Sequence, residues 1–198
     1  MGKLYFRYGV MGSAKSATLL IQKHAFEEAG FHVCVLKPDT DTRDYRVVKS
    51  RIDGLSCECS GIETYFDLVP LVLAHFPEDD VKKWVLVDEC QFLTEKQVDE
   101  LREICDTTDI SVMCYGLRTD FMTKLFPGSK RLMETADTIE EIKSSCPFCG
   151  KKATVNARYD KKTGTVITDG EQIMIGGDET YIPMCSSYYR KHKNSAGL

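Results

Sequence analysis

An eight-residue turn near the start of the chain has the residue types of a phosphate-binding loop. It runs through Gly9, Val10, Met11, Gly12, Ser13, Ala14, Lys15 and Ser16. In such a loop, backbone N–H groups and the positive end of the following helix hold anionic phosphates. Lys15 would reach the β- and γ-phosphates, and the Ser16 hydroxyl would bind Mg²⁺. The sequence therefore predicts a site for ATP and Mg²⁺, against the alternative of an ordinary surface turn.

Ala14 departs from the phosphate-loop motif, which has its second glycine at this position. If the position requires a positive φ, alanine costs roughly 1–2 kcal/mol relative to glycine. Its methyl group would also crowd the phosphates. We therefore expect that replacing Ala14 with glycine tightens ATP binding or raises kcat.

Two adjacent carboxylates are the second candidate for chemistry. Asp88 and Glu89 follow the apolar run 84–87, which is too short for a helix and predicts a buried strand. Ligands of α/β sheets bind at the carboxyl ends of strands, where Asp88 would hold Mg²⁺ directly or through water. Glu89 would take the proton from an attacking hydroxyl. The alternative is a pair of solvated acids, and the phosphate loop upstream favours the catalytic interpretation.

Three of the nine cysteines are the third candidate, a structural zinc site. Cys146 and Cys149 have the spacing of a metal-binding knuckle, and Cys185 supplies a third thiolate. Structural zinc takes four ligands. His192 is the candidate for the fourth, with Asp or water as alternatives. The competing interpretation is a vestigial site with three reduced thiols and no metal.

The elements that must position these groups alternate between strands and helices. Strands are predicted over 3–8, 31–38, 84–89 and 109–117, and helices over 17–26, 64–76 (shortened by Pro70) and 94–106. This alternation predicts a parallel α/β sheet. Composition shifts near Ser144, where short strands around 153–159 and 164–168 follow the cysteine knuckle. We therefore predict an α/β domain over 1–143, a small β-type domain over 144–191 and a tail over 192–198.

Composition limits the class of protein. A hydrophobic content of 42% with 10% aromatic residues is enough for a packed core. A net charge of −4 argues against a nucleic-acid-binding surface. No apolar run is long enough for a membrane span, and residues 1–10 lack the apolar core of a signal peptide. We expect a cytoplasmic protein with no nucleic-acid or membrane partner, whose other six cysteines are reduced and pack as small core residues.

Five motifs occur in order along the chain: GxMxxxKS at 9–16, DECQF at 88–92, YGLRTDF at 115–121, CxxC at 146–149 and IGG at 175–177. Each motif alone is weak, but the ordered set is specific. It resembles the type II thymidine kinases, the cytosolic kind, which join a RecA-like P-loop parallel sheet domain to a small zinc-ribbon lasso domain. The resemblance covers the chain from Lys3 to Tyr189.

This resemblance implies an activity and a set of site residues. Family members transfer the γ-phosphoryl group of ATP to the 5′-hydroxyl of thymidine, and Glu89 matches their general base. Asp88 and Gln91 join the phosphate loop as nucleotide-binding residues. The residues that enclose the thymine ring match Met11, Phe92, Leu117, Phe121 and Phe126, for which core packing is the alternative. The lasso residues that hydrogen-bond the base and sugar match Asn156, Met174, Ile175, Gly176 and Tyr181.

Four further positions bear on the resemblance. Arg43 and Arg51 are candidates to contact phosphates, and Arg118 to neutralise charge beside the site. The family supplies its fourth zinc ligand as Cys or His three residues after the third. Here that residue is Tyr188, whose neutral phenol is a poor ligand, so we expect weaker zinc binding than in a four-ligand relative.

The sequence thus predicts an ATP-dependent thymidine kinase that uses Mg²⁺ and Zn²⁺ and makes dTMP in nucleotide salvage, with deoxyuridine as a further acceptor. The resemblance alone implies a homotetramer. The competing hypothesis is a P-loop ATPase or switch module whose cysteine knuckle binds a protein or nucleic acid. The lysines that cluster near the knuckle lie beside acidic neighbours, which disfavours that reading.

Overall fold

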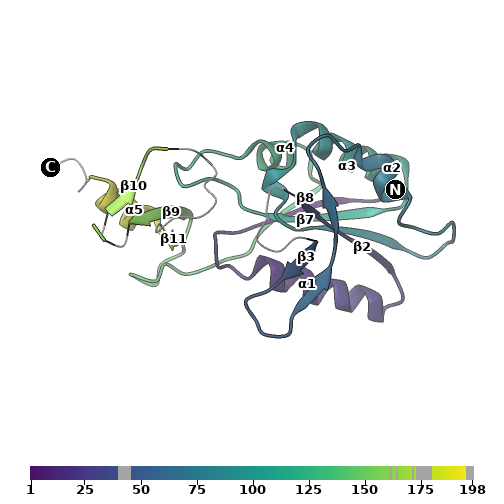
Figure 1. The fold of residues 1–198 in the computed structure, drawn as a ribbon, viewed down its shortest axis with the longest axis horizontal. Coiled ribbons are helices and arrows are strands. Elements are labelled where there is room, and N and C mark those ends of the chain that lie inside the picture. Colours follow the sequence, from purple (N-terminus) through teal and green to yellow (C-terminus); the bar gives the residue numbers. More distant parts are fainter. Residues whose placement is uncertain (40–45, 161, 164, 171, 173–179, 195–198) are drawn as a thin grey trace.

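A parallel sheet forms the centre of the larger part of the chain (Figure 1). The computed structural model describes residues 1–39, 46–160, 162–163, 165–170, 172 and 180–194. The sheet has the order β5-β2-β6-β7-β1-β8, and all its pairings are parallel. Its strands are β1 (Leu4–Tyr8), β2 (His32–Pro38), β5 (Ser60–Ile62), β6 (Lys83–Val87), β7 (Ser111–Gly116) and β8 (Thr138–Glu141). The predicted parallel α/β sheet is confirmed.

Helices cover both faces of this sheet (Figure 1). One face carries α1 (Lys15–Glu28), and the other carries α2 (Leu68–Leu73), α3 (Glu95–Thr107) and α4 (Pro127–Thr135). Side chains of β6 alternate between the two cores: Val85 and Val87 pack on the side of α2–α4, and Leu86 packs on the side of α1. Burial on both faces explains why this strand is a continuous apolar run.

Local sequence signals explain where two of the helices begin and end. The Thr94 hydroxyl accepts a hydrogen bond from the Gln97 N–H, and the Gln97 side chain accepts one from the Thr94 N–H, both at 3.1 Å. This capping box starts α3 where it was predicted. The helix predicted over 64–76 is only Leu68–Leu73, because proline is tolerated in the first turn of a helix and Pro70 falls there.

Two short strands fall in a region for which the sequence favours no element. They are β3 (Val47–Lys49) and β4 (Ser56–Glu58), which pair antiparallel.

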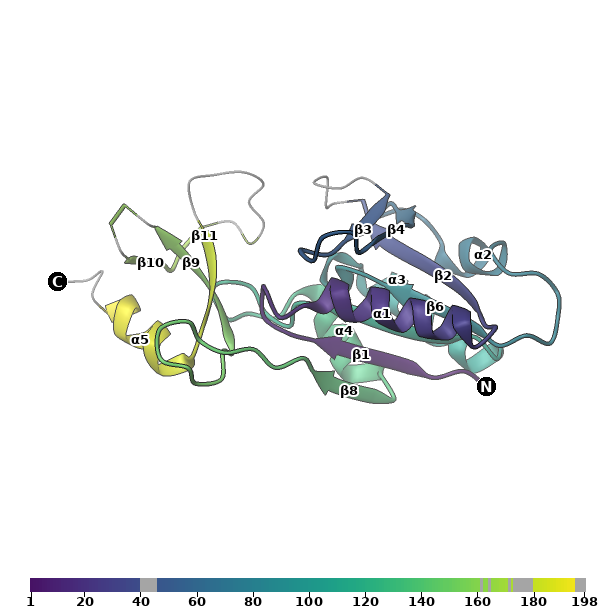
Figure 2. The ribbon, with the colours of Figure 1, turned by 90° about the horizontal axis from the view of Figure 1, so that it is seen from below.

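The smaller part of the chain forms an antiparallel sheet in the order β10-β9-β11, beside a terminal helix (Figure 2). Its elements are β9 (Val155–Asp160), β10 (Thr165–Ile167), β11 (Thr180–Met184) and α5 (Ser186–Asn194). The buried core here is small and consists of Val155, Ala157, Val166, Met184 and Tyr189. Helix α5 extends into the segment that was predicted as a tail. No helix in the described ranges is both long and apolar enough to cross a membrane.

Candidate active site

Three neighbouring strands end at the candidate site. The phosphate loop follows β1, Asp88 and Glu89 follow β6, and Leu117 follows β7, which lies between them in the sheet. The Ser16 hydroxyl donates a hydrogen bond of 3.0 Å to Asp88 Oδ2. The topology therefore brings together two motifs that are 72 residues apart in the chain, as the resemblance implied.

Two residues of the phosphate loop, Ala14 and Gly9, stand where the backbone restricts the choice of side chain. Ala14 has φ 62° and ψ 30°, in the left-handed region, immediately before α1. The positive φ considered from the sequence is therefore present, and alanine carries its cost. A Cβ on Gly9 would lie 2.3 Å from Ser13 Oγ and 2.8 Å from the Ile142 carbonyl oxygen. Only glycine fits that position.

Lys15 is buried inside the loop and donates a hydrogen bond of 2.9 Å to the Val10 carbonyl oxygen. Burial lowers its pKa, and the carboxylates of Glu89 and Asp88 act in the opposite direction. The Arg51 guanidinium also lies beside the loop, since its Nη1 would be 3.7 Å from a Cβ on Gly12. A phosphate group in this loop would meet these two cations. Arg43 lies outside the described residues.

Asp88 fits the role of a metal ligand. It is 3% exposed, and burial together with the neighbouring Glu89 carboxylate raises its pKa to about 7. Its Oδ1 is buried without a hydrogen-bond partner in the described structure. A buried carboxylate oxygen in that state is costly unless it meets a cation. The Asp88 carboxylate and the Ser16 hydroxyl are the hard oxygen donors that Mg²⁺ takes.

Glu89 lies beside Asp88 in a strained conformation. Its backbone has φ 51° and ψ 37°, a region that costs a residue with a side chain about 1–2 kcal/mol. Such strain persists only where the surrounding structure enforces it. A single 3₁₀ turn, η2 (Cys90–Phe92), follows, and Gln91 in this turn contacts the Glu89 carboxylate rather than the phosphate loop. Neither the strain nor this contact is visible in the sequence.

The residues expected around a thymine ring follow the same three strands. Phe121 and Phe126 are buried, whereas Met11, Phe92 and Leu117 keep part of their surface exposed. The rings of Phe92 and Phe126 meet edge to face, with 5.9 Å between their centres. Arg118 lies over the Tyr8 ring at 5.3 Å from its centre, beside the phosphate loop.

The small sheet docks on these loops through polar side chains of β9. Asn156 accepts a hydrogen bond of 2.7 Å from the Met11 N–H and donates one of 2.9 Å to the Thr119 carbonyl oxygen. Asn156 thus joins the phosphate loop to the loop after β7. Its expected contact with a nucleoside stays a prediction, and Met174, Ile175 and Gly176 lie outside the described residues.

Arg158 is the largest fully buried side chain in the described structure, and sequence reasoning missed it. Its guanidinium carbon lies 3.7 Å from the centre of the Phe121 ring, and it donates hydrogen bonds of 2.8 and 3.2 Å to the Tyr181 hydroxyl. Arg158 shares a strand face with Asn156, opposite the apolar Val155 and Ala157. The alternation of polar and apolar residues in this strand can be seen in the sequence. It does not show that the polar face is buried as well.

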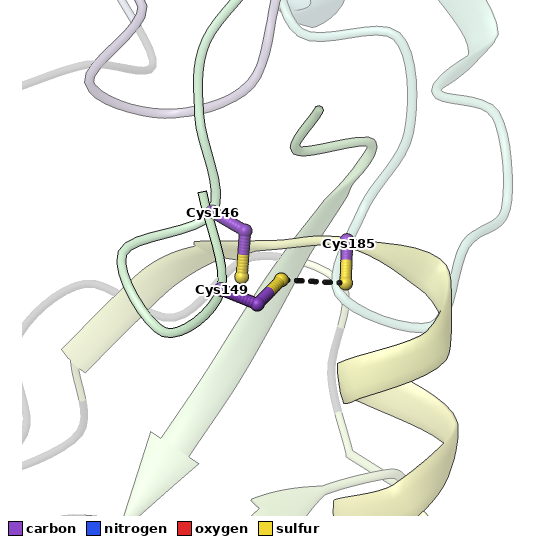
Figure 3. Close-up of side chains that lie close together, drawn as sticks. All are labelled: Cys146, Cys149 and Cys185. Carbon is purple, nitrogen blue, oxygen red and sulfur yellow. Dashed lines mark hydrogen bonds between the residues drawn. The ribbon is translucent and has the colours of Figure 1, made fainter. Parts of the chain in front are cut away.

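The three cysteines after residue 144 come together, as predicted (Figure 3). Their sulfur atoms lie within 4.8 Å of one another, and those of Cys149 and Cys185 are 3.5 Å apart. Burial opposes ionisation of Cys146, but the N–H groups of Cys185 and Phe148 outweigh it and lower the Cys146 pKa. Three sulfur ligands that face one point fit a zinc ion with one position left.

His192 does not belong to this group of three in the part of the chain that is described. Its ring stacks on Tyr188 with 4.3 Å between centres, and Tyr188 stacks on Phe148, also at 4.3 Å. Tyr188, which stands at the sequence position of the family's fourth zinc ligand, is thus part of an aromatic stack. The Tyr188 N–H donates to Cys185 Sγ at 3.3 Å.

The chain is similar to known proteins over almost its whole length. A family model described as thymidine kinase matches residues 2–189. Thymidine kinases from Streptococcus agalactiae and Yersinia pseudotuberculosis are 42% and 39% identical to this chain, each over 96% of it and over 97% and 96% of their own lengths. The thymidine kinase of Rhodopirellula baltica is 43% identical, over 96% of this chain and 89% of its own. Among solved structures, the Pif1 helicase from Candida albicans aligns with a TM-score of 0.44 and 16% identity, over 71% of this chain and 36% of that one, and nothing further rests on this likeness.

Proposed function

The chain belongs to the thymidine kinase family, and we propose that it transfers the γ-phosphoryl group of ATP to the 5′-hydroxyl of thymidine. The observation that carries this proposal is the hydrogen bond between Ser16 and Asp88 with Glu89 next to it. It joins a phosphate loop to a carboxylate pair at the edge of the sheet where α/β proteins bind ligands.

The residues divide the work of phosphoryl transfer, which requires positioning and charge neutralisation more than covalent chemistry. Loop N–H groups and Lys15 hold the phosphates. Asp88 and Ser16 would hold Mg²⁺, which neutralises the charge that develops on the phosphoryl oxygens. Glu89 accepts the proton of the 5′-hydroxyl. The loop after β7, covered by β9, provides the nucleoside side of the site and keeps out water that would otherwise hydrolyse ATP.

Zinc has a structural role in this proposal. Cys146, Cys149 and Cys185 hold it and thereby fasten the knuckle to the start of α5. The remaining position is open to water or to a side chain that the described structure does not place there, and His192 keeps that assignment as a prediction. Family membership also supports a homotetramer that acts in the cytoplasm in nucleotide salvage, with deoxyuridine as a further acceptor.

The test is ADP release from ATP and Mg²⁺ with and without thymidine. We expect release to depend on thymidine. Turnover of ATP that is equally fast without thymidine would instead support a P-loop ATPase or switch module. Size-exclusion chromatography with light scattering tests the tetramer separately.

A further inference from the structure

The Gln91 side chain connects the proposed base to the loop on the nucleoside side of the site. Gln91 is 1% exposed. Its Nε2 donates a hydrogen bond of 2.6 Å to Glu89 Oε2, and its Oε1 accepts one of 2.9 Å from the Leu117 N–H. Both ends of the amide are therefore used within the protein.

The orientation of this amide is fixed by its partners. A backbone N–H can only donate, so the atom that faces Leu117 must be the amide oxygen. The NH₂ group is then left to face Glu89, where it donates to Oε2 of the carboxylate. No described residue hydrogen-bonds Glu89 Oε1, which leaves this oxygen to receive a proton.

The backbone at the end of β7 lies close to the Gln91 side-chain amide. A Cβ on Gly116 would lie 2.6 Å from Gln91 Oε1 and 2.6 Å from Cys90 Sγ. Glycine at the end of β7 is thus required for the Gln91 side chain to pass. The left-handed conformation of Glu89 at the other end of the turn brings its carboxylate back to Gln91, two residues further along the chain.

From these contacts we infer that Gln91 is a positioning residue that holds the Glu89 carboxylate at a fixed place relative to the loop after β7. The inference rests on the proposed function. It differs from the sequence-based assignment of Gln91 to the nucleotide-binding residues, because the two hydrogen bonds of the amide join Glu89 to the loop after β7.

A double-mutant cycle tests the inference. Gln91→Met keeps the length of the side chain and removes both hydrogen bonds. We expect kcat to fall about tenfold to a hundredfold, the range seen when a residue that orients a metal ligand through a hydrogen bond is removed. The KM values for thymidine and ATP should stay within about threefold. In a Glu89→Gln background the same substitution should change kcat by less than about twofold, because the base through which Gln91 acts is gone.

Gln97 offers a matched control. It is 2% exposed, and its amide also bonds at both ends, to the Thr94 N–H and the Glu63 carbonyl oxygen. Gln97→Met should lower the melting temperature and leave kcat unchanged. Label transfer from [γ-³²P]ATP to thymidine gives the sensitivity that the Glu89→Gln background needs.

Three outcomes overturn the inference. An equal fall of kcat in both backgrounds means a structural role, and no fall in either means no role. Recovery of Gln91→Met at high Mg²⁺ means a metal ligand. If Gln91→Met does not fold although Gln97→Met does, Gln91→Glu, which keeps an oxygen for the Leu117 N–H, enters the same cycle with the same expectation. Wild-type protein that does not phosphorylate thymidine would reject the proposed function itself, before any variant is compared.

Discussion

The two parts of this protein hold their functional residues in different ways. In the larger part, the ends of β6, β7 and β1 place Asp88, Leu117 and the phosphate loop side by side, and a sheet covered on both faces keeps them there. In the smaller part, a three-stranded sheet with a small core relies on three thiols and on a few polar contacts. We therefore expect damage to the first part to lower kcat, and damage to the second to lower stability and nucleoside affinity.

The largest effect should come from the proposed base. Glu89→Gln keeps the shape of the side chain and removes its ability to accept a proton, so kcat should fall by about 10²–10⁴. The KM values should change little, because the phosphate loop and the loop after β7 are untouched. Initial-rate kinetics with both substrates measure this, and near-normal turnover would show that Glu89 is not the base.

The cysteine cluster should control the smaller part without entering the chemistry. Protein purified without chelator should contain zinc, whereas Cys146→Ser should lose it and melt at lower temperature, since metal binding contributes folding free energy. Cys57→Ser, at a partly exposed thiol outside the cluster, is the control and should keep the metal. Elemental analysis decides: less than roughly a tenth of an equivalent of zinc in the wild type, allowing for weak binding, contradicts the zinc site.

Arg158 tests how the two parts are coupled. Arg158→Met removes the guanidinium from the Phe121 ring and leaves the Tyr181 hydroxyl without its donor. Loss of a buried partner costs about 1–3 kcal/mol. If that cost displaces the loop, it corresponds to a rise in the thymidine KM of about 5- to 150-fold. The KM for ATP should stay nearly constant. Arg131→Met, which removes partly exposed ion pairs with Asp99 and Glu134, should leave both KM values unchanged; an equal rise in the two variants would refute the coupling.

Substitution of Ala14, in the larger part of the protein, should give the smallest change in activity and stability. Ala14→Gly relieves left-handed strain of roughly 1–2 kcal/mol, partly offset by about 0.5–1 kcal/mol of glycine's extra backbone entropy. We expect a slightly higher melting temperature and an ATP KM that falls, or a kcat that rises, by a few fold. Ala17→Gly, inside α1, should destabilise instead. Weaker ATP binding by Ala14→Gly would mean that the loop is adapted to alanine.

The sequence predicted the parts of the site that depend on local order. The phosphate loop that leads to Lys15 follows β1, and Asp88 and Glu89 follow β6. Parallel strands bring their carboxyl ends to one edge, so the meeting of these residues followed from the topology. The two bonds of Gln91 and the room that Gly116 leaves for it depend on how β7 approaches the turn after β6. The spacing of residues along the chain does not show how closely β7 approaches this turn, so these contacts could not be predicted.

The smaller part was harder to predict for a related reason. The gathering of Cys146, Cys149 and Cys185 followed from knuckle spacing, but the burial of Arg158 did not, because a charged residue in an alternating strand is ordinarily on the exposed face. His192 was assigned by its distance from Cys185 along the chain. In the structure α5 continues through it, and its ring stacks on Tyr188 one helical turn earlier.

The most direct test of the central claim follows the labelled γ-phosphoryl group of ATP. Wild-type protein with [γ-³²P]ATP, Mg²⁺ and thymidine should place the label on thymidine 5′-monophosphate, with little in inorganic phosphate. The Glu89→Gln variant should form the same product about 10²–10⁴ times more slowly. Label that appears in inorganic phosphate at the same rate with and without thymidine would contradict the claim.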